Sequence, residues 1–137
     1  MGSFSDYLEN TLLNHAFRTA TYTSATNLYV GLSTTTWAGA TADAYTGTTA
    51  ANEVSGGAYV RKVCNTWDSS TAGATENTQP VTFAQATADW GTVQSWFIAD
   101  KTTLGNIIVW GTLTTAKAVS SGDTLKFATG DIDVTLA

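Results

Sequence analysis

Apolar residues recur at two spacings along the chain, and the change between them separates a helical start from a β-rich remainder. Residues 3–17 carry an apolar stripe with the spacing of one helix face, formed by Phe4, Leu8, Leu12 and Ala16. Ser3 and Asp6 have the spacing of a capping box, which predicts that the helix begins there. Leu13 and Phe17 fall on a second side of this helix. Two apolar faces predict that the helix is covered both by its own domain and by a neighbouring molecule.

From residue 27 onward, apolar and polar residues alternate with the period of two that is typical of β-strands. The alternation predicts strands at residues 28–33, 58–64, 81–83, 92–99, 106–113, 125–127 and 132–136. The last two form a predicted hairpin, and the mixed pattern of 58–64 is typical of an edge strand. We expect a mainly β fold, a β-sandwich or jelly roll of about seven to eight antiparallel strands with one N-terminal α-helix. The length of 137 residues fits one domain, residues 1–137, with the sandwich over 27–137.

The strand at 106–113 has apolar residues on both of its faces. Simple alternation divides them into two sets, Ile107, Val109 and Leu113 on one face and Ile108 and Trp110 on the other. Strands with apolar side chains on both faces are covered on both sides. We therefore expect this strand at the centre of the fold.

Residues 34–53 are rich in Thr, Ala and Gly and show neither period. A loop of this length in a small domain is usually either functional or mobile. Trp37 and Tyr45 lie in it, and Trp67 begins another turn-rich connection. Large aromatic side chains in such loops are either tucked under the loop or free to bind a partner, and the sequence does not separate these alternatives.

Asp89, Trp90 and Gly91 directly precede the strand at 92–99. An acid beside an indole is a candidate for catalysis or sugar binding, but each residue also has a structural use. Asp can bond its own backbone two residues on, Trp can close one end of a sandwich, and Gly allows a positive φ at the start of a strand. We favour the structural role, because no second carboxylate stands near this tripeptide in the sequence.

Charged residues make up only 12% of the chain, which carries a net charge of −5. Its six Lys and Arg residues do not form a cluster, so neither nucleic acid nor an anionic membrane is an expected partner. A weakly charged surface has little to desolvate when another protein covers it. The composition therefore favours a surface that is buried in an assembly.

Cys64 is the only cysteine, which excludes a disulfide framework and a thiolate metal site. We expect it to be a small buried residue of its strand. The N-terminal segment does not have the pattern of a secretory signal, and no apolar run is long enough to span a membrane. These features predict a chain made in a reducing cytoplasm.

The sequence offers no set of residues that matches a known catalytic or metal-binding pattern. Its single histidine, His15, lies on the predicted helix, and the Gly-Leu-Ser sequence at 31–33 does not continue into a nucleophile elbow. Asp131 and Asp133 share a face of one strand, but calcium requires more oxygen ligands than this pair offers. We therefore expect no enzymatic activity, no cofactor and no metal.

Five stretches of the chain form a recognisable series: residues 3–10 (SFSDYLEN), 28–33 (LYVGLS), 53–59 (EVSGGAY), 83–91 (FAQATADWG) and the closing hairpin. In this order they resemble a family of small virion structural proteins of tailed bacteriophages, whose members are described as capsid decoration (cement), head-fibre or tail-fibre proteins. The resemblance runs through nearly the whole chain. The loop at 34–53, Cys64 and Trp67 depart from the family's usual pattern.

The resemblance implies a non-enzymatic β-fold, made in the host cytoplasm, that binds the major capsid protein on the exterior of the capsid as a homotrimer. A capsid cement protein is the expected member, because the chain is short and has no fibrous shaft. The helix and the loop aromatics are then the interface candidates: Phe4, Tyr7, Leu8, Leu12, Leu13, Phe17, Trp37, Tyr45 and Trp67.

Two other functions remain open. A receptor-binding or glycan-binding module of a head or tail fibre predicts that Trp37, Tyr45 and Trp67 form one exposed patch. A small esterase or glycosidase predicts a pocket that holds Asp89 or His15 together with a second polar group.

Overall fold

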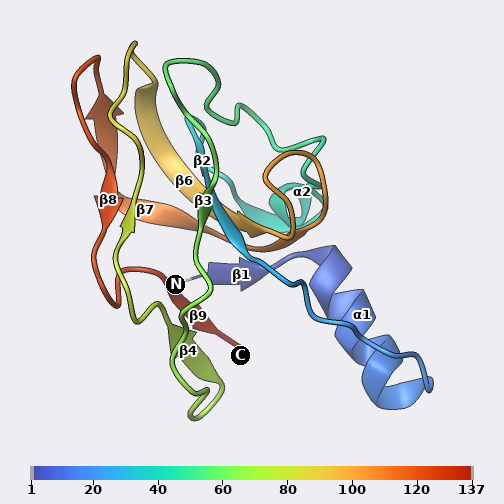
Figure 1. Ribbon diagram of the computed structural model, residues 1–137. Helices are drawn as coiled ribbons and strands as arrows, with labels where there is room; N and C mark the ends of the chain where they lie inside the picture. Colours follow the sequence, from blue (N-terminus) through green and yellow to red (C-terminus); the bar gives the residue numbers. More distant parts are fainter. Residues whose placement is uncertain (1, 137) are drawn as a thin grey trace.

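The computed structural model describes residues 2–136 (Figure 1). Its elements in chain order are β1 (Gly2–Phe4), α1 (Asp6–Phe17), β2 (Tyr29–Ser33), α2 (Gly39–Asp43), β3 (Lys62–Val63), β4 (Ala74–Glu76), β5 (Val81–Thr82), β6 (Gly91–Ala99), β7 (Ile107–Val119), β8 (Lys126–Phe127) and β9 (Asp133–Thr135). Seven strands form one sheet in the order β3-β2-β6-β7-β1-β9-β4, and β5 and β8 form a second.

The predicted mainly β fold with one long helix is confirmed, but a sandwich or jelly roll is not. Seven of the strands belong to a single curled sheet, and the small second sheet lies against one of its faces (Figure 1). Within these sheets every pairing is antiparallel except that of β1 with β9. The predicted edge strand is confirmed, because β3 ends the sheet. The loop at 34–53 contains the short helix α2, which its composition does not indicate.

The strands β6 and β7 are the longest and lie at the centre of the large sheet. Apolar side chains pack on both of their faces, as predicted. One cluster, between the large sheet and β5-β8, includes Leu32, Trp96, Ile98, Val109 and Phe127. The other cluster, beside α2, includes Trp37, Phe97, Ile107 and Trp110. The helix α2 and the small sheet therefore cover opposite faces (Figure 1).

Ile107 lies on the opposite face from the one that alternation predicts. Between β6 and β7, Ala99 pairs with Ile107 and Ile98 pairs with Val109, so Ile108 is left without a partner of its own. This extra residue is a β-bulge, which reverses the facing of the residue beyond it. Ile107 consequently packs in the cluster beside α2, while Val109 packs in the other cluster.

The helix α1 ends at Phe17 as predicted, but its N-cap is Ser5 and not Ser3. The backbone of Ser5 is extended, and its Oγ accepts a hydrogen bond of 3.3 Å from the Leu8 N–H. Ser3 instead lies in β1, directly opposite Trp110 of β7. The pairing of β1 with β7 explains the difference, because backbone hydrogen bonding in the sheet holds Ser3, although exposed, in extended conformation and so outweighs a local capping motif.

The predicted C-terminal hairpin does not form, because β8 pairs with β5 while β9 pairs with β1 and β4. The buried side chain of Asn77 lies between the two segments. Its Oδ1 accepts from the Ile132 N–H and its Nδ2 donates to the Ala128 carbonyl, each at 2.9 Å. Buried backbone groups need partners, and here a side chain supplies them. The strands at 125–127 and 132–136 can then pair with different neighbours.

Two glycines allow large rings to lie across a neighbouring strand. Gly31 is the cross-strand partner of Phe97, and Gly111 is that of Trp96. A Cβ on Gly31 would lie 2.2 Å from the Phe97 ring, and one on Gly111 would lie 2.6 Å from the Trp96 ring. Both rings therefore pack on strand backbone that only glycine leaves open.

Candidate interaction surface

The helix α1 stands out from the sheet (Figure 1). It packs against β7, and Leu8 in its first turn is buried. Leu12 is half-buried, and Phe4, in β1 just before the helix, packs against the core. The inner apolar face of α1 is thus the face that the chain covers itself.

Three large side chains of α1 are exposed, Tyr7 by 38%, Leu13 by 57% and Phe17 by 81%. Both of the apolar faces predicted for this helix are therefore present, one packed on the sheet and one open. An isolated helix of about 12 residues is marginally stable in water. Since Leu8 is its only buried residue, the outer part of α1 would gain stability from a further contact.

The chain turns back on itself after α1. The N–H groups of Arg18 and Ala20 both donate to the Asn14 carbonyl, at 3.0 and 3.3 Å. His15 Nδ1 lies 3.0 Å from the Ala20 carbonyl oxygen and 3.3 Å from the Tyr22 nitrogen. Burial, the largest cause, and nearby negative charge raise the pKa of Tyr22 above its usual value. The contacts of His15 are local, so this histidine shapes the exposed turn.

An apolar cleft of about 210 Å³ opens at the base of α1, and we call it the basal cleft. Its walls are formed by Phe4, Leu8, Leu28, Trp67, Thr75, Ile98, Ile108, Val109 and Val134. Thr75 alone among these has a side chain that is neither aliphatic nor aromatic. The ring of Trp67 is held in place because its Nε1–H donates to the Cys64 carbonyl at 2.9 Å. The cleft is therefore suited to an apolar side chain.

Acidic side chains gather on the other face of the β4-β9 edge, because Glu76 and Asp133 alternate with Thr75 and Val134, which line the basal cleft. Asp68, Glu76 and Asp133, which we call the acidic rim, line a hollow that shares Thr75 with the cleft. Glu76 and Asp133 are direct cross-strand partners in β4 and β9. Like charges in such positions destabilise a sheet, so a cation would be favoured here. The one ion pair within residues 2–136 lies elsewhere in the molecule.

Trp37 and Tyr45 are tucked under the loop at 34–53. Trp37 is buried, stacks on Phe97 with 5.1 Å between ring centroids, and donates its Nε1–H to Ser33 Oγ at 3.0 Å. Tyr45 meets Trp37 edge-on at 4.8 Å. Trp67 packs with the cluster on the other face of the sheet. The three aromatics therefore do not form the exposed patch that glycan binding predicts.

A wider hollow of about 680 Å³ lies between the start of the chain and the loop at 34–53. Trp37 and Trp110, both almost fully buried, form part of its wall. Glu9 is its only ionisable lining residue. Glycoside hydrolysis uses two carboxyl groups, so this hollow lacks the pair that a glycosidase needs.

Asp89, Trp90 and Gly91 hold the start of β6. Trp90 is buried and donates its Nε1–H to the Gly57 carbonyl at 2.8 Å, and Gly91 adopts a φ of 84°. Asp89 does not bond its own backbone as predicted, since its Oδ1 accepts from the Ser121 N–H at 2.8 Å. The tripeptide thus ties β6 to two turns that are distant in sequence.

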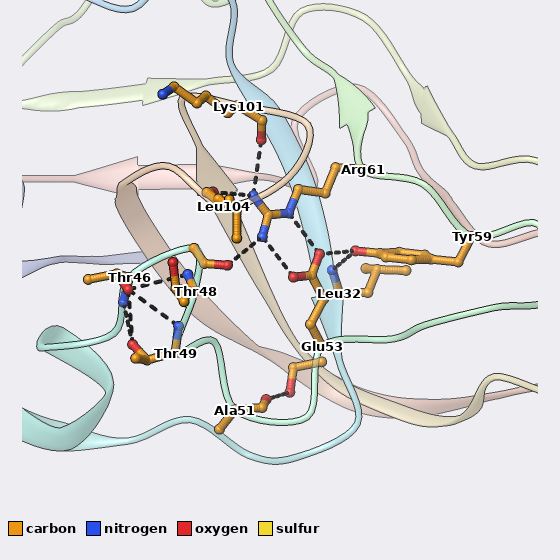
Figure 2. A network of polar contacts seen from close by, with 12 residues as sticks. Leu32, Thr46, Thr48, Thr49, Ala51, Glu53, Tyr59, Arg61, Lys101 and Leu104 are labelled. Atoms are coloured by element: carbon orange, nitrogen blue, oxygen red, sulfur yellow. Dashed lines mark hydrogen bonds and ion pairs between the residues drawn. The ribbon is translucent and has the colours of Figure 1, made fainter.

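A buried polar network centred on Arg61 was not predicted (Figure 2). The Arg61 Nε and Nη2 groups donate to the two carboxylate oxygens of Glu53, each at 2.7 Å. The remaining N–H groups donate to the carbonyls of Gly47, Lys101 and Leu104. All five guanidinium N–H groups therefore have acceptors.

The network joins the loop at 34–53 to the sheet. The Tyr59 hydroxyl donates to Glu53 at 3.0 Å and accepts from the Leu32 N–H at 2.9 Å. Burial, followed by the charge of Glu53, raises the pKa of Tyr59 well above its usual range. The guanidinium of Arg61 also lies 4.9 Å from the Phe97 ring centroid. The position of Arg61, a basic residue within the predicted strand at 58–64, was the one feature of the sequence that pointed to this network.

Cys64 is buried as predicted, and burial raises the pKa of its thiol. Within residues 2–136, no three His, Cys, Asp or Glu side chains gather as a group that could hold a metal ion. In that same part of the chain, no helix has the length and apolar character needed to cross a membrane.

Residues 3–135 match the family described as Podophage GP4 fiber I protein gp80. The chain belongs to this family. The predicted membership in a phage virion structural protein family is thereby confirmed, and the location that follows from it is the virion. No curated protein matches the chain.

Proposed function

We propose that this chain is a non-enzymatic subunit of a phage fibre, and that the exposed side of α1 joins it to its neighbours in the virion. The family description names a fibre protein, and the match covers residues 3–135. The observation that carries the proposal is the exposure of Leu13 and Phe17 on a helix that stands out from the sheet (Figure 1). Burying such a side chain contributes roughly 1.5–3 kcal/mol, which favours a protein partner.

We further propose that the subunits associate as homotrimers. In a closed ring of three copies, each exposed helix finds a partner and none is left in water. The composition supports this, because with only 12% charged residues the surface loses little hydration when it is buried.

A capsid cement protein is the second candidate. Its support is the architecture of residues 2–136, which form one curled sheet and one small sheet without a fibrous shaft. In this role, the exposed side of α1 would contact the major capsid protein on the exterior of the shell.

Copy number in purified virions separates the two roles. For a fibre at the tail, we expect quantitative mass spectrometry to find about a dozen copies per virion, in proportion to the symmetry of the tail. Hundreds of copies would instead place the protein on the capsid, as expected for a cement protein. Absence of the protein from purified virions would contradict both forms of the proposal.

Point variants test whether α1 holds the protein in the virion. Removing the helix is unsuitable, because Leu8 is buried. The double variant Leu13→Ser, Phe17→Ser changes exposed side chains only, and we expect virions grown with it to contain far less of the protein. Val60→Ser is the matched control, since Val60 is 63% exposed and lies outside α1. Equal incorporation of both variants would count against a role for α1.

A further inference from the structure

The loop that joins β6 to β7, residues 100–106, holds a leucine in a conformation that this residue type disfavours. Leu104 has a φ of 55° and is 60% exposed. A bulky residue at positive φ is a rare outlier, because its Cβ comes too close to the backbone carbonyl oxygen. Burial does not offset this conformational cost, since most of the Leu104 surface lies in water.

Hydrogen bonds brace the backbone of this loop. At its base, the Asp100 carboxylate accepts from the N–H and the Nδ2 of Asn106, both at 2.8 Å. The buried Arg61 donates to the carbonyls of Lys101 and Leu104, at 3.0 and 2.9 Å (Figure 2). The loop therefore has a defined shape, although it lies at the surface.

Gly47, in the loop at 34–53, supports Leu104 from beneath. Its N–H donates to the Gly105 carbonyl at 3.0 Å. A Cβ on Gly47 would lie 1.7 Å from the Leu104 carbonyl oxygen, so only glycine leaves room for it. Strained backbone persists where the surrounding structure holds it in place, and it clusters at functional sites. The arrangement around Leu104 therefore indicates a function for its exposed side chain.

The side chains that the loop presents are suited to a protein partner. Residues 101–104, Lys-Thr-Thr-Leu, are all exposed. Leu104 has neither a ring on which a sugar could stack nor a polar group that could bond it. Lys101 is the only charged residue among the four, and a single cation does not bind nucleic acid. An aliphatic side chain instead gains free energy when a protein buries it.

We propose that Leu104 is a preformed anchor, held by the Arg61 network, that inserts into an apolar pocket of a neighbouring protein in the virion. The inference rests on the proposed assembly function and adds a second contact to that of α1. Membership in a phage fibre family supplies the setting, because the neighbours of a virion protein are other proteins. A braced loop also loses little conformational freedom on binding. Lys101 beside the anchor favours a pocket with an acidic edge.

Replacement by asparagine separates binding from folding. Asparagine tolerates a positive φ but cannot fill an apolar pocket. We expect Leu104→Asn to keep the Tm of the full chain or to raise it by roughly 2–4 °C. Its amount in purified virions, measured by quantitative mass spectrometry, should fall at least about tenfold, because the burial of one aliphatic side chain is lost. A fold that is no less stable excludes unfolding as the cause.

Ala72→Asn is the matched control. Ala72 is exposed and has a φ of 53°, and Gly73 follows it with a φ of 78°. Asn-Gly is favoured in a turn of this kind, so the variant should be stabilised and should enter virions normally. Leu104→Met retains an apolar side chain of similar size and should also enter virions normally.

NMR relaxation tests whether the anchor is preformed. We expect the amides of residues 101–105 in the isolated wild-type chain to be as ordered as those of β6, with S² of about 0.85. Arg61→Lys keeps a charge beside Glu53 but lacks the forked donors that reach the loop carbonyls, so S² should fall in this loop. Wild-type values below about 0.6 would overturn the preformed anchor. An unchanged loop in Arg61→Lys would overturn the role given to Arg61.

Failure of this inference and failure of the proposed function give different results. Equal amounts of wild type and Leu104→Asn in virions would overturn the anchor and leave the role of α1 intact. A marked fall in the Tm of Leu104→Asn would also overturn it, since Leu104 would then be packed within its own chain. Loss of Leu104→Asn from virions that retain the Leu13→Ser, Phe17→Ser variant would support the anchor and contradict the role of α1. Absence of the wild-type protein from virions would overturn both.

Discussion

The Arg61 network and the outer side of α1 differ in whether their interacting groups have partners within the chain. Around Arg61, every guanidinium N–H has an acceptor within the chain, and the side chain of Arg61 is 2% exposed. On α1, Leu8 is the only buried residue, and Phe17 at its end is 81% exposed. Both regions are ordered parts of one small protein.

This difference predicts that the Arg61 network contributes to the stability of the fold and that the outer side of α1 contributes to assembly. The network satisfies its charges and hydrogen bonds internally, so changes to it should affect folding. The outer side of α1 leaves apolar surface in water, so changes to it should affect what the protein binds.

The largest effect is expected at Arg61. Arg61→Met leaves the Glu53 carboxylate without its partner, and we expect the free energy of unfolding to fall by about 3–5 kcal/mol in urea denaturation. Lys62→Met, at the adjacent exposed residue, should change it by less than about 0.5 kcal/mol. Similar values for the two variants would show that the network is not a principal source of stability.

A smaller loss is expected at Asn77. Asn77→Ala leaves the buried Ile132 N–H and the Ala128 carbonyl without partners, which costs about 1–3 kcal/mol. The amide of Ile132 should also exchange its hydrogen faster in NMR measurements. Asn65→Ala, which removes an exposed amide, is the control and should cost less. Unchanged exchange at Ile132 would contradict the role given to Asn77.

Alkaline pH should weaken the network through Tyr59, whose pKa is raised above the usual value of 10.0. Below pH 10, the phenol is neutral in both the folded and the unfolded chain, and its full contribution is present. Above it, the unfolded chain loses the proton first, so the free energy of unfolding falls by up to about 1.4 kcal/mol per pH unit. Urea denaturation on both sides of pH 10 should show a smaller fall for Tyr59→Phe. Equal falls would mean that Tyr59 does not retain its proton.

The smallest effect on folding is expected at the open helix. For Phe17→Ser, measured at a concentration below that of self-association, we expect the free energy of unfolding to stay within about 0.5 kcal/mol of the wild type. Circular dichroism during urea denaturation would measure it. A loss as large as that of Asn77→Ala would show that Phe17 is already packed within its own chain, and the contrast between the two regions would disappear.

Much of the secondary structure could be predicted because it depends on local periodicity. The helix ends at Phe17 as expected, and the strand predicted at 92–99 is β6, Gly91–Ala99. The errors occur where a distant partner decides the outcome. A bulge reverses Ile107, and Asn77 separates the two C-terminal strands. Neither effect can be recognised from a short stretch of the sequence.

The candidate site was predicted in part for the same reason. The open face of α1 follows from the positions of Leu13 and Phe17 on a helix, which periodicity reveals. The basal cleft collects residues from Phe4 to Val134, and the acidic rim depends on the register of β4 with β9. No local pattern brings such residues together, so neither feature could be anticipated.

The sequence by itself determined the mainly β character, the two-faced helix, the weakly charged surface and the family motifs, because each is a property of composition or of neighbouring positions. The tertiary structure alone decided that Trp37 is buried, that Arg61 closes a network, and that an apolar cleft opens at the base of α1. These features depend on strand order and register, which are set by contacts between residues far apart in the chain.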